Sequence, residues 1–396
     1  METQLTNTPA GENNSNPSWS VELTAEYEST DSHGSKFGVE LAGTGTVTID
    51  WGDGTVLENI QMPELKELKK ESDAGHEWYK YEGAEYTHPY DKVGSYSVKI
   101  SGQGGDMTLL RLQKKADFSS VVLNHCDRLQ RFNCFDTKLT SLDLSGCTQL
   151  KELDCSGNDL LTTLDVSGCT QLKELECYCN QLTSLDVSGC TQLKELECND
   201  NELTSLNING CTQLEVLKCN ENQLTSLDVS KNTQLKWLEC YENQLTSLDV
   251  SKNTQLEGLE CYENPLTSLD VSKNTQLKEL NCLGNELTSL DVSKNTLLES
   301  LNCNDNELTS LDVSECTPLD LLACSYNELT SLDISKNTQL KWLVCYGNPL
   351  SVEATNQIYN DLPVVGQGEG NIFVNQGTAG DYRLAEAKGW KVDFRQ

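Results

Sequence analysis

Hydrophobic residues recur at a fixed interval through the middle of the chain. A leucine opens the same phrase, Leu-x-x-Leu-x-Cys-x-x-Asn-x-Leu-Thr-Ser-Leu-Asp-Val-Ser, eleven times between residues 129 and 350. The interval is 21 residues except between Leu150 and Leu172, where one extra residue, Leu160 or Leu161, makes it 22. A fixed period of this length predicts a solenoid of stacked coils. The opening leucines are Leu129, Leu150, Leu172, Leu193, Leu214, Leu235, Leu256, Leu277, Leu298, Leu319 and Leu340.

The first half of each phrase alternates apolar and polar positions, as a strand with one buried face requires. In the coil opened by Leu235, Leu238 and Cys240 are expected to point inward, whereas Trp237, Glu239 and Tyr241 point outward. Stacked coils place these strands about 4.8 Å apart in a parallel sheet, so eleven coils span roughly 50 Å. The second half of the phrase is too short and too rich in β-branched residues for a helix. We therefore expect an extended or 3₁₀ return and gentle curvature.

Two polar residues recur with the leucines. The Asn at the end of each strand (Asn243 in one coil) is expected to donate hydrogen bonds to carbonyls of the neighbouring coil. The Asp in the return half (Asp249 in the same coil) could form a metal-binding ladder, but capping of backbone N–H groups is the favoured interpretation. The whole phrase resembles the leucine-rich repeat, and many tandem copies make that resemblance specific.

The N-terminal quarter follows a different pattern. Residues 1–18 are polar and predict a disordered tail. Residues 19–102 alternate as short strands between Gly and Asp turns. The phrases at 47–55 (VTIDWGDGT) and 87–98 (THPYDKVGSYSV) resemble the signature of the PKD domain, which implies an immunoglobulin-like β-sandwich. An insert at 57–82 is expected to be a long helical or mobile loop. Asp50, Asp53 and Asp91 could bind calcium, although turn carboxylates usually bond to backbone N–H groups.

The ends of the repeat region need covers, because an open sheet edge invites aggregation. Residues 103–128 are expected to be a linker followed by a half coil, since 118–126 align with the return half at 139–147. Residues 351–396 predict a small α/β cap, with helices at 352–361 and 382–388 and strands at 371–375 and 390–394. The expected fold is therefore mainly β, a PKD-like sandwich followed by a solenoid of eleven coils (129–350) and a cap.

Charge and cysteine content narrow the function. The net charge of −32 argues against a nucleic-acid partner and favours a basic one. No apolar run is long enough to cross a membrane. Of the 18 cysteines, eleven take the inward strand position and six take a turn position that other coils fill with Asn. We expect reduced thiols packed as small hydrophobes, because neighbours in such a row suit disulfide geometry poorly. Zinc, which needs four converging ligands, is the alternative.

Repeats of 21 residues with a cysteine in the strand resemble the bacterial internalin-like class of surface proteins. This resemblance implies an exported protein, located extracellularly or on the outer cell surface, with a role in adhesion or ligand binding. The chain opens with a polar stretch rather than an apolar signal core, so we expect an export signal to be missing from it. The sequence shows no nucleophile–base pair, phosphate loop or metal-ligand cluster. We therefore expect a monomeric non-enzyme without cofactor, metal site or catalytic residue.

The outward strand positions vary and carry the binding hypothesis. Exposed Trp and Tyr on a rigid face are typical interaction anchors. The favoured ligand is a protein, with a carbohydrate or a purely architectural spacer role as alternatives. Trp342 and Tyr346 are expected to pack under the cap rather than bind. The candidate ligand-binding residues are Trp237, Glu239, Tyr241, Gly258, Glu260, Tyr262, Glu174, Glu176, Glu195 and Glu197.

Overall fold

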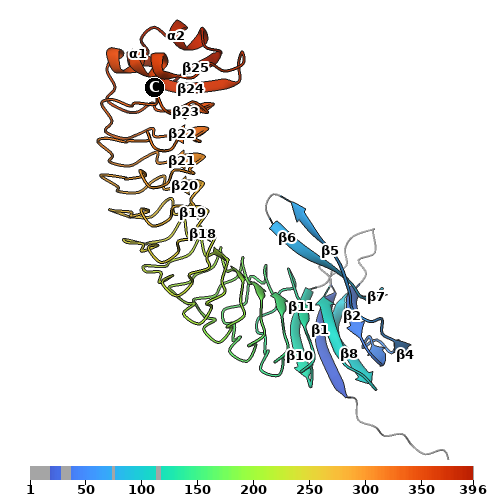
Figure 1. The fold of residues 1–396 in the computed structure, drawn as a ribbon. Coiled ribbons are helices and arrows are strands. Elements are labelled where there is room, and N and C mark those ends of the chain that lie inside the picture. The colour runs from blue at the N-terminus through green and yellow to red at the C-terminus, as the bar shows by residue number, and fades with distance from the viewer. Residues whose placement is uncertain (1–17, 28–36, 74–75, 113–116, 396) are drawn as a thin grey trace, which may run out of the picture.

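The protein is a curved solenoid with a β-rich unit at its N-terminal end and a small α/β cap at its C-terminal end (Figure 1). The structure, a computed structural model, describes residues 18–27, 37–73, 76–112 and 117–395, with the backbone alone for 67–82. The tail expected at 1–18 therefore lies outside the described residues apart from Ser18. The mainly β class is confirmed, and a single cluster of buried side chains runs from Trp19 to Trp390.

A sheet of 16 strands lines the concave side of the solenoid (Figure 1). Each coil contributes one three-residue strand, and all eleven pair in parallel with their partners in register, for example Leu238 opposite Leu259. The central Leu of each strand and the Cys that follows it are buried, as the alternation predicted. The coil strands are β11 (Arg131–Asn133), β12 (Glu152–Asp154), β13 (Glu174–Glu176), β15 (Glu195–Glu197), β17 (Val216–Lys218), β18 (Trp237–Glu239), β19 (Gly258–Glu260), β20 (Glu279–Asn281), β21 (Ser300–Asn302), β22 (Leu321–Ala323) and β23 (Trp342–Val344).

The return halves are extended segments joined by turns, in agreement with the expectation of a helix-free return. Two of them, β14 (Ser184–Asp186) and β16 (Ser205–Asn207), pair as a small parallel sheet. The additional residue of the long coil is Leu160, because Leu160 is 52% exposed whereas Leu161 is fully buried. The inserted residue thus lies outside the core, and the buried leucines on either side of it keep the register of the other coils.

The asparagines at the strand ends tie adjacent coils together. Asn264 Nδ2 donates to the carbonyl of Cys261 at 3.2 Å and to that of Cys240, one coil earlier, at 3.1 Å. Asn264 Oδ1 accepts from Leu245 N at 3.0 Å. These bonds pair backbone groups that would otherwise be buried without partners. The predicted role of this Asn is confirmed.

The cysteines pack as free thiols, and 17 of the 18 are buried. Burial raises the pKa of the strand cysteines, for example that of Cys282 to about 12. A neutral, buried thiol is a poor nucleophile, so these side chains act as small hydrophobic groups.

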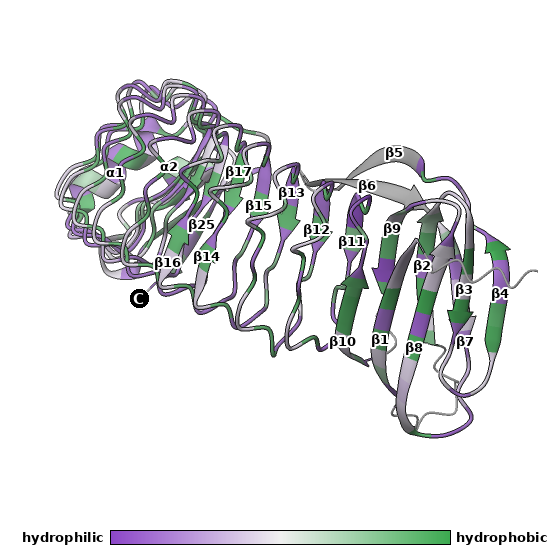
Figure 2. Ribbon diagram, turned by 90° about the horizontal axis from the view of Figure 1, so that it is seen from below, coloured by the Kyte–Doolittle hydropathy of each residue, from purple (hydrophilic) through white to green (hydrophobic). Residues whose placement is uncertain are grey.

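The N-terminal unit has two main sheets and shares one of them with the solenoid. One sheet has the order β10-β1-β8-β3-β4, and the strands β7, β2 and β9 extend the long concave sheet beyond β11. Figure 2 shows these strands lying beside the first coils. The strands are β1 (Trp19–Tyr27), β2 (Phe37–Gly43), β3 (Thr46–Asp50), β4 (Val56–Gln61), β7 (Ala84–His88), β8 (Gly94–Gln103), β9 (Met107–Leu112) and β10 (Asp117–Asn124).

The linker expected from residue 103 is wrong, because this stretch contains β9, whereas the half coil expected at 118–126 coincides with β10. β9 lies between β2, with which it is antiparallel, and β11, with which it is parallel. β10 pairs antiparallel with β1 while aligning with the return half of the first coil. Met107, Leu110 and Leu112 are buried, and their burial fixes β9 as the strand that joins the N-terminal unit to the solenoid.

The insert at 57–82, expected as a helical or mobile loop, is also corrected. It holds the end of β4 and a hairpin of β5 (Lys66–Asp73) and β6 (His76–Glu82), which pair antiparallel. The hairpin extends on the side of the concave sheet (Figure 1). The aromatic residues Trp78, Tyr79 and Tyr81 suit a strand better than a helix.

The C-terminal cap contains the expected order of helices and strands. It consists of α1 (Val352–Asp361), β24 (Gly370–Asn375), the 3₁₀ turn Gln376–Thr378, α2 (Arg383–Glu386) and β25 (Trp390–Arg395). Ser351 caps α1 by accepting from Ala354 N. β24 and β25 continue the concave sheet in parallel, while Ile358 and Tyr359 of α1 are fully buried. The cap thus lengthens the sheet as well as covering its last coil.

Candidate functional site

The ten residues proposed from the sequence lie on one continuous part of the concave face. The sheet order β13-β15-β17-β18-β19 places the four glutamates on the first two strands and the remaining candidates on or just after the last two. One strand, β17, separates the two groups. At about 4.8 Å per strand the five strands span roughly 19 Å. The structure therefore brings the candidates together as two neighbouring patches.

The acidic patch consists of Asp154, Glu174, Glu176, Glu195 and Glu197. Glu174 lies opposite Glu195, and Glu176 lies between Asp154 and Glu197 in the same register. Burial, with the charges of Asp154 and Glu197, raises the pKa of Glu176 to about 8. Like-charged carboxylates on adjacent strands repel each other and disfavour ionisation. Ionisation is therefore disfavoured within the patch, and a cation nearby would favour it.

Basic side chains limit this patch at both ends. Arg131 forms two hydrogen bonds with Glu152, at 2.7 and 2.9 Å. On the other side, Lys218 Nζ lies 2.6 Å from Glu197 Oε1, and both side chains are largely buried. Lys218 thus separates the acidic patch from the next group of candidates.

The tryptophan–tyrosine patch consists of Trp237, Gly258, Tyr241 and Tyr262 with Glu239 and Glu260. A Cβ atom at Gly258 would lie 2.2 Å from the Trp237 ring, so the indole lies across the backbone of the neighbouring strand. Trp237 Nε1 donates to Glu239 Oε1 at 2.7 Å. The rings of Tyr241 and Tyr262 stack with centroids 4.1 Å apart and an interplanar angle of 9°. Gly258 is therefore a requirement of the indole's position, and the patch is preorganised.

A further group of aromatic residues, the C-terminal aromatic patch, was not among the candidates. Trp342 is 41% exposed and Tyr326 is 52% exposed, so the cap, under which Trp342 was expected to pack, covers it only in part. The Trp342 ring packs beside Phe373 with centroids 5.2 Å apart, and Tyr326 meets Tyr346 edge to face at 5.1 Å. The cap extends the sheet instead of folding over it, and this leaves the aromatic side chains accessible. The repeat register alone could have found Trp342, since it occupies the same column as Trp237.

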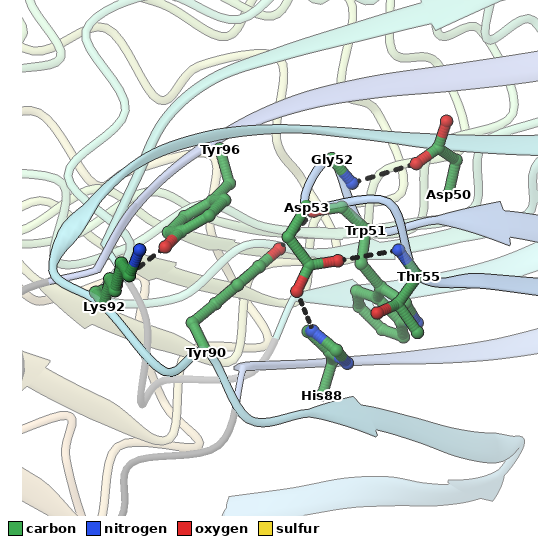
Figure 3. Close-up of polar contacts among 9 residues, drawn as sticks. All are labelled: Asp50, Trp51, Gly52, Asp53, Thr55, His88, Tyr90, Lys92 and Tyr96. Atoms are coloured by element: carbon green, nitrogen blue, oxygen red, sulfur yellow. Dashed lines mark hydrogen bonds and ion pairs between the residues drawn. The ribbon is translucent and has the colours of Figure 1, made fainter.

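The aspartates with a possible metal role make turn hydrogen bonds instead. Asp249 Oδ1 accepts from Ser251 N at 2.9 Å, and the same bond recurs along the return halves. In the N-terminal unit, Asp50 accepts from Gly52 N, and Asp53 accepts from Thr55 N while its other oxygen lies 2.7 Å from His88 Nε2 (Figure 3). Backbone capping, the favoured interpretation, is thus observed at these positions.

Tyrosines complete the same cluster of the N-terminal unit. Tyr90 donates to the carbonyl of Trp51 at 2.6 Å and stacks on Tyr96 with centroids 3.7 Å apart (Figure 3). Trp51 in turn stacks on His88 at 5.3 Å. The two phrases noted in the sequence therefore meet in one packed core, where they stabilise the turn between β3 and β4.

The described part of the chain holds no group of three or more His, Cys, Asp or Glu side chains arranged to bind a metal ion. Among the same residues, none of the helices has the length and apolar character that crossing a bilayer requires.

Comparison with known proteins supports the repeat interpretation. Residues 127–168 match the family model for leucine-rich repeats in two copies. The parallel concave sheet and the helix-free return are repeated through all the coils, and the Asn at the strand end is repeated in every coil but the first, which has Thr137. The coils form a leucine-rich repeat solenoid. A comparison with curated protein sequences found no match.

Several solved leucine-rich repeat structures are similar to the chain. The functional domain of InlJ from Listeria monocytogenes, which includes a cysteine ladder, is 34% identical over 63% of this chain and 65% of its own length, with a TM-score of 0.46. The chain thus spans just under two-thirds of that domain. The internalin InlF from Listeria monocytogenes is 19% identical over 73% of this chain and 87% of its own, with a TM-score of 0.50. A leucine-rich repeat protein of Leptospira interrogans is 24% identical over 63% and 79%, with a TM-score of 0.46.

The leucine-rich repeat fold is typically a scaffold for protein interaction rather than for catalysis. Its neighbours include internalins, in which this type of solenoid is used.

Proposed function

We propose that the protein is a binding or adhesion protein of a bacterial cell surface, or a secreted one, that recognises a protein ligand through the concave face of its leucine-rich repeats. The observation that carries this proposal is the segregation of the concave face into an acidic patch and two aromatic patches on one rigid sheet. The PKD-like signature of the N-terminal unit supports a location outside the cell, because such modules accompany repeat arrays in exported proteins.

The physical argument rests on preorganisation. Trp and Tyr side chains supply large contact areas at low entropic cost and dominate many protein interfaces. Trp237 is held in place by Glu239, and Tyr241 and Tyr262 hold each other, so little freedom remains to be lost on binding. The acidic patch beside them would attract a basic partner and orient it. A protein ligand with a basic region next to an apolar one fits both patches.

A carbohydrate ligand is the second candidate, and the geometry of Trp237 favours it. The indole lies across Gly258, and a flat aromatic ring beside carboxylate and amide groups suits stacking against a sugar. Glu260 and Asn281 on the adjacent strands would supply the polar contacts. Salt separates the two candidates, because charge-steered protein binding weakens with ionic strength whereas sugar stacking barely responds.

The proposal is tested by binding of the purified chain to a panel of host matrix proteins, mucins and microbial polysaccharides. The wild type is compared with the double variant Trp237→Ala/Tyr262→Ala. We expect a hit on one ligand class that weakens about tenfold or more in the variant, since removing two hot-spot aromatics costs about 2 kcal/mol or more. Binding is measured by surface plasmon resonance at two salt concentrations.

The control is Asn302→Ala, which alters a polar side chain of the same face on β21, two strands from Gly258 and outside the contacts proposed for either ligand. This variant should bind like the wild type. A hit that both variants retain would move the site to the acidic patch or to the N-terminal unit. The absence of any hit would contradict the binding proposal and leave the architectural spacer as the function.

A further inference from the structure

The return side of the solenoid carries a groove that the concave-face proposal does not use. A hollow of about 820 Å³ lies between β10 and the return halves of the next three coils. Its apolar wall is formed by Val121–Leu123 with Leu142 and Leu164. Val122 is 48% exposed at the rim of this wall. We call this hollow the return groove.

Carboxylates also line the return groove. Asp143, Asp165 and Asp186 project from successive coils, and none of the residues that line the hollow is basic. The return halves bring these residues close together, since the backbones of Asp143 and Asp165 form a parallel β-bridge. Hydrogen bonds from Ser167 lower the pKa of Asp165, whereas the charges of Asp143 and Asp186 act in the opposite direction. The groove thus combines an apolar wall with mutually repelling negative charges.

In other coils, the aspartate at the equivalent repeat position has a lysine nearby. Five coils place a lysine three residues after the Asp, and its charge favours the ionised carboxylate, as Lys231 does for Asp228. In the coils that line the groove this position is Gly146, Gly168 or Gly189. A Cβ atom at Gly146 would meet nothing within 4 Å, so no steric reason excludes a side chain there. The five lysines are Lys231, Lys252, Lys273, Lys294 and Lys336.

We propose that the return groove is a second binding site, which takes an extended cationic segment of a protein partner. Lysine or arginine side chains of that segment pair with Asp143, Asp165 and Asp186, while its apolar side chains rest on Val122 and Leu123. The groove crosses four neighbouring segments, or about 15 Å, which an extended peptide covers with about five residues. The site is independent of the concave face, since it lies on the other side of the coils.

The test uses a fluorescent eight-residue peptide of alternating Lys and Val and the complete chain. Fluorescence anisotropy is compared for the wild type, for Asp143→Asn/Asp165→Asn/Asp186→Asn, and for the control Asp249→Asn/Asp270→Asn/Asp291→Asn. Both triple variants lose three charges from the same repeat position. Asn is compatible with this position, because Asn207 Oδ1 already accepts from Asn209 N at 3.3 Å.

We expect the groove variant to weaken binding about tenfold, whereas the control changes it by less than about twofold. The loss of three exposed ion pairs accounts for a change of this size, since tenfold in affinity corresponds to about 1.4 kcal/mol. The variant Gly146→Lys/Gly168→Lys, which copies the lysines of the other coils, should weaken binding to a similar extent. Equal weakening by both triple variants would show attraction to net charge alone and would overturn the site. Failure of the wild type to bind the peptide at low salt, or equal binding of a Glu-Val peptide, would overturn it as well.

Discussion

The two halves of the solenoid use different chemistry at the same turn. In the coils opened by Leu129 to Leu193 the turn residue is Cys, whereas in those opened by Leu214 to Leu319 it is Asn, with Cys316 as the exception. Asn253 Nδ2 donates to the carbonyls of Val229 and Asn232, at 3.0 and 2.9 Å. Cys190 offers the carbonyl of Val166 only a thiol, at 3.6 Å. Both halves nevertheless keep the same backbone and the same buried leucines.

The difference shows how a densely packed interior tolerates substitution. The Asn adds two good hydrogen bonds, but its Oδ1 is buried and has no hydrogen-bond partner within the described part of the chain. The Cys makes one weak bond and leaves no orphaned acceptor. An unsatisfied buried group costs about 1–3 kcal/mol, so gain and loss nearly cancel. The two halves therefore differ in this buried turn residue, while the stacking of their coils is the same.

The largest expected effect is loss of the Asn at the strand end, which both halves share. Asn264→Ala removes the donor to Cys240 and Cys261 and the acceptor for Leu245 N. We expect about 3–5 kcal/mol less free energy of unfolding, because several buried backbone groups lose partners. Urea denaturation followed by circular dichroism measures the change.

Asn180→Ala makes the same test in the first half. Asn180 Nδ2 donates to Cys155 and Cys177, but its Oδ1 accepts from Asn158 N because Leu160 lengthens the coil. An equal loss would show that the ladder stabilises both halves alike. A loss under about 1 kcal/mol in either half would contradict the role assigned to this Asn.

An intermediate effect is expected from the carboxylates of the two concave patches. The pKa of Glu176 is raised to about 8 by burial and neighbouring carboxylates. The folded state therefore binds this proton more tightly than the unfolded state does. Its stabilising contribution is complete below the ordinary pKa of Glu and is lost as pH rises through about 8. Glu176→Gln should stabilise the protein on the order of 1–2 kcal/mol at pH 8.5 and have little effect at pH 4.5.

Glu260→Gln is the matched variant in the second half. Burial and the charges of Glu239 and Glu279 raise the pKa of Glu260 in the same direction. Thermal unfolding between pH 4.5 and 8.5 compares the two variants, and we expect the smaller pH-dependent gain for Glu260→Gln. A gain at Glu176 that does not change with pH would contradict the electrostatic explanation.

The smallest effect is expected from exchanging the turn residues themselves. Asn253→Cys removes two hydrogen bonds but also the orphaned Oδ1, so we expect a loss of about 1 kcal/mol. Cys190→Asn is the reciprocal change and should stabilise by a smaller amount. Chemical denaturation of both variants measures the pair. Losses of more than about 3 kcal/mol in both would show that each half depends on its own turn chemistry.

The sequence predicts the repeated part of the fold well because the same pattern of apolar and polar residues recurs in every coil. The buried Leu and Cys positions, the role of the Asn and the elements of the cap all follow from periodicity and local signals. β9 was missed because it occurs once and its pairing depends on β2, which is far away in the sequence. The half coil at 118–126 was expected, but its pairing with β1 was not. The β5–β6 hairpin was missed for a related reason, since its many Glu and Lys residues suit helices as well as strands.

The candidate site was predictable in its columns but not in its accessibility. The register placed Trp237 beside Gly258 and Glu174 beside Glu195, and the structure pairs these residues in that way. Whether an outward side chain near the C-terminus is covered depends on the position of the cap. The sequence predicted that the cap would cover Trp342, whereas this residue is 41% exposed. The return groove had no signal in the sequence beyond the missing lysines, because its wall comes from β10.

The in-register stacking of the coils also makes the solenoid a ruler. Each 21-residue unit adds one strand of about 4.8 Å between the acidic patch and the C-terminal aromatic patch. Duplication or deletion of a coil between β19 and β22 would therefore change the separation of these patches in fixed steps without altering either of them. Variation in the number of coils would then select among ligands by length, with no change in the residues that touch them.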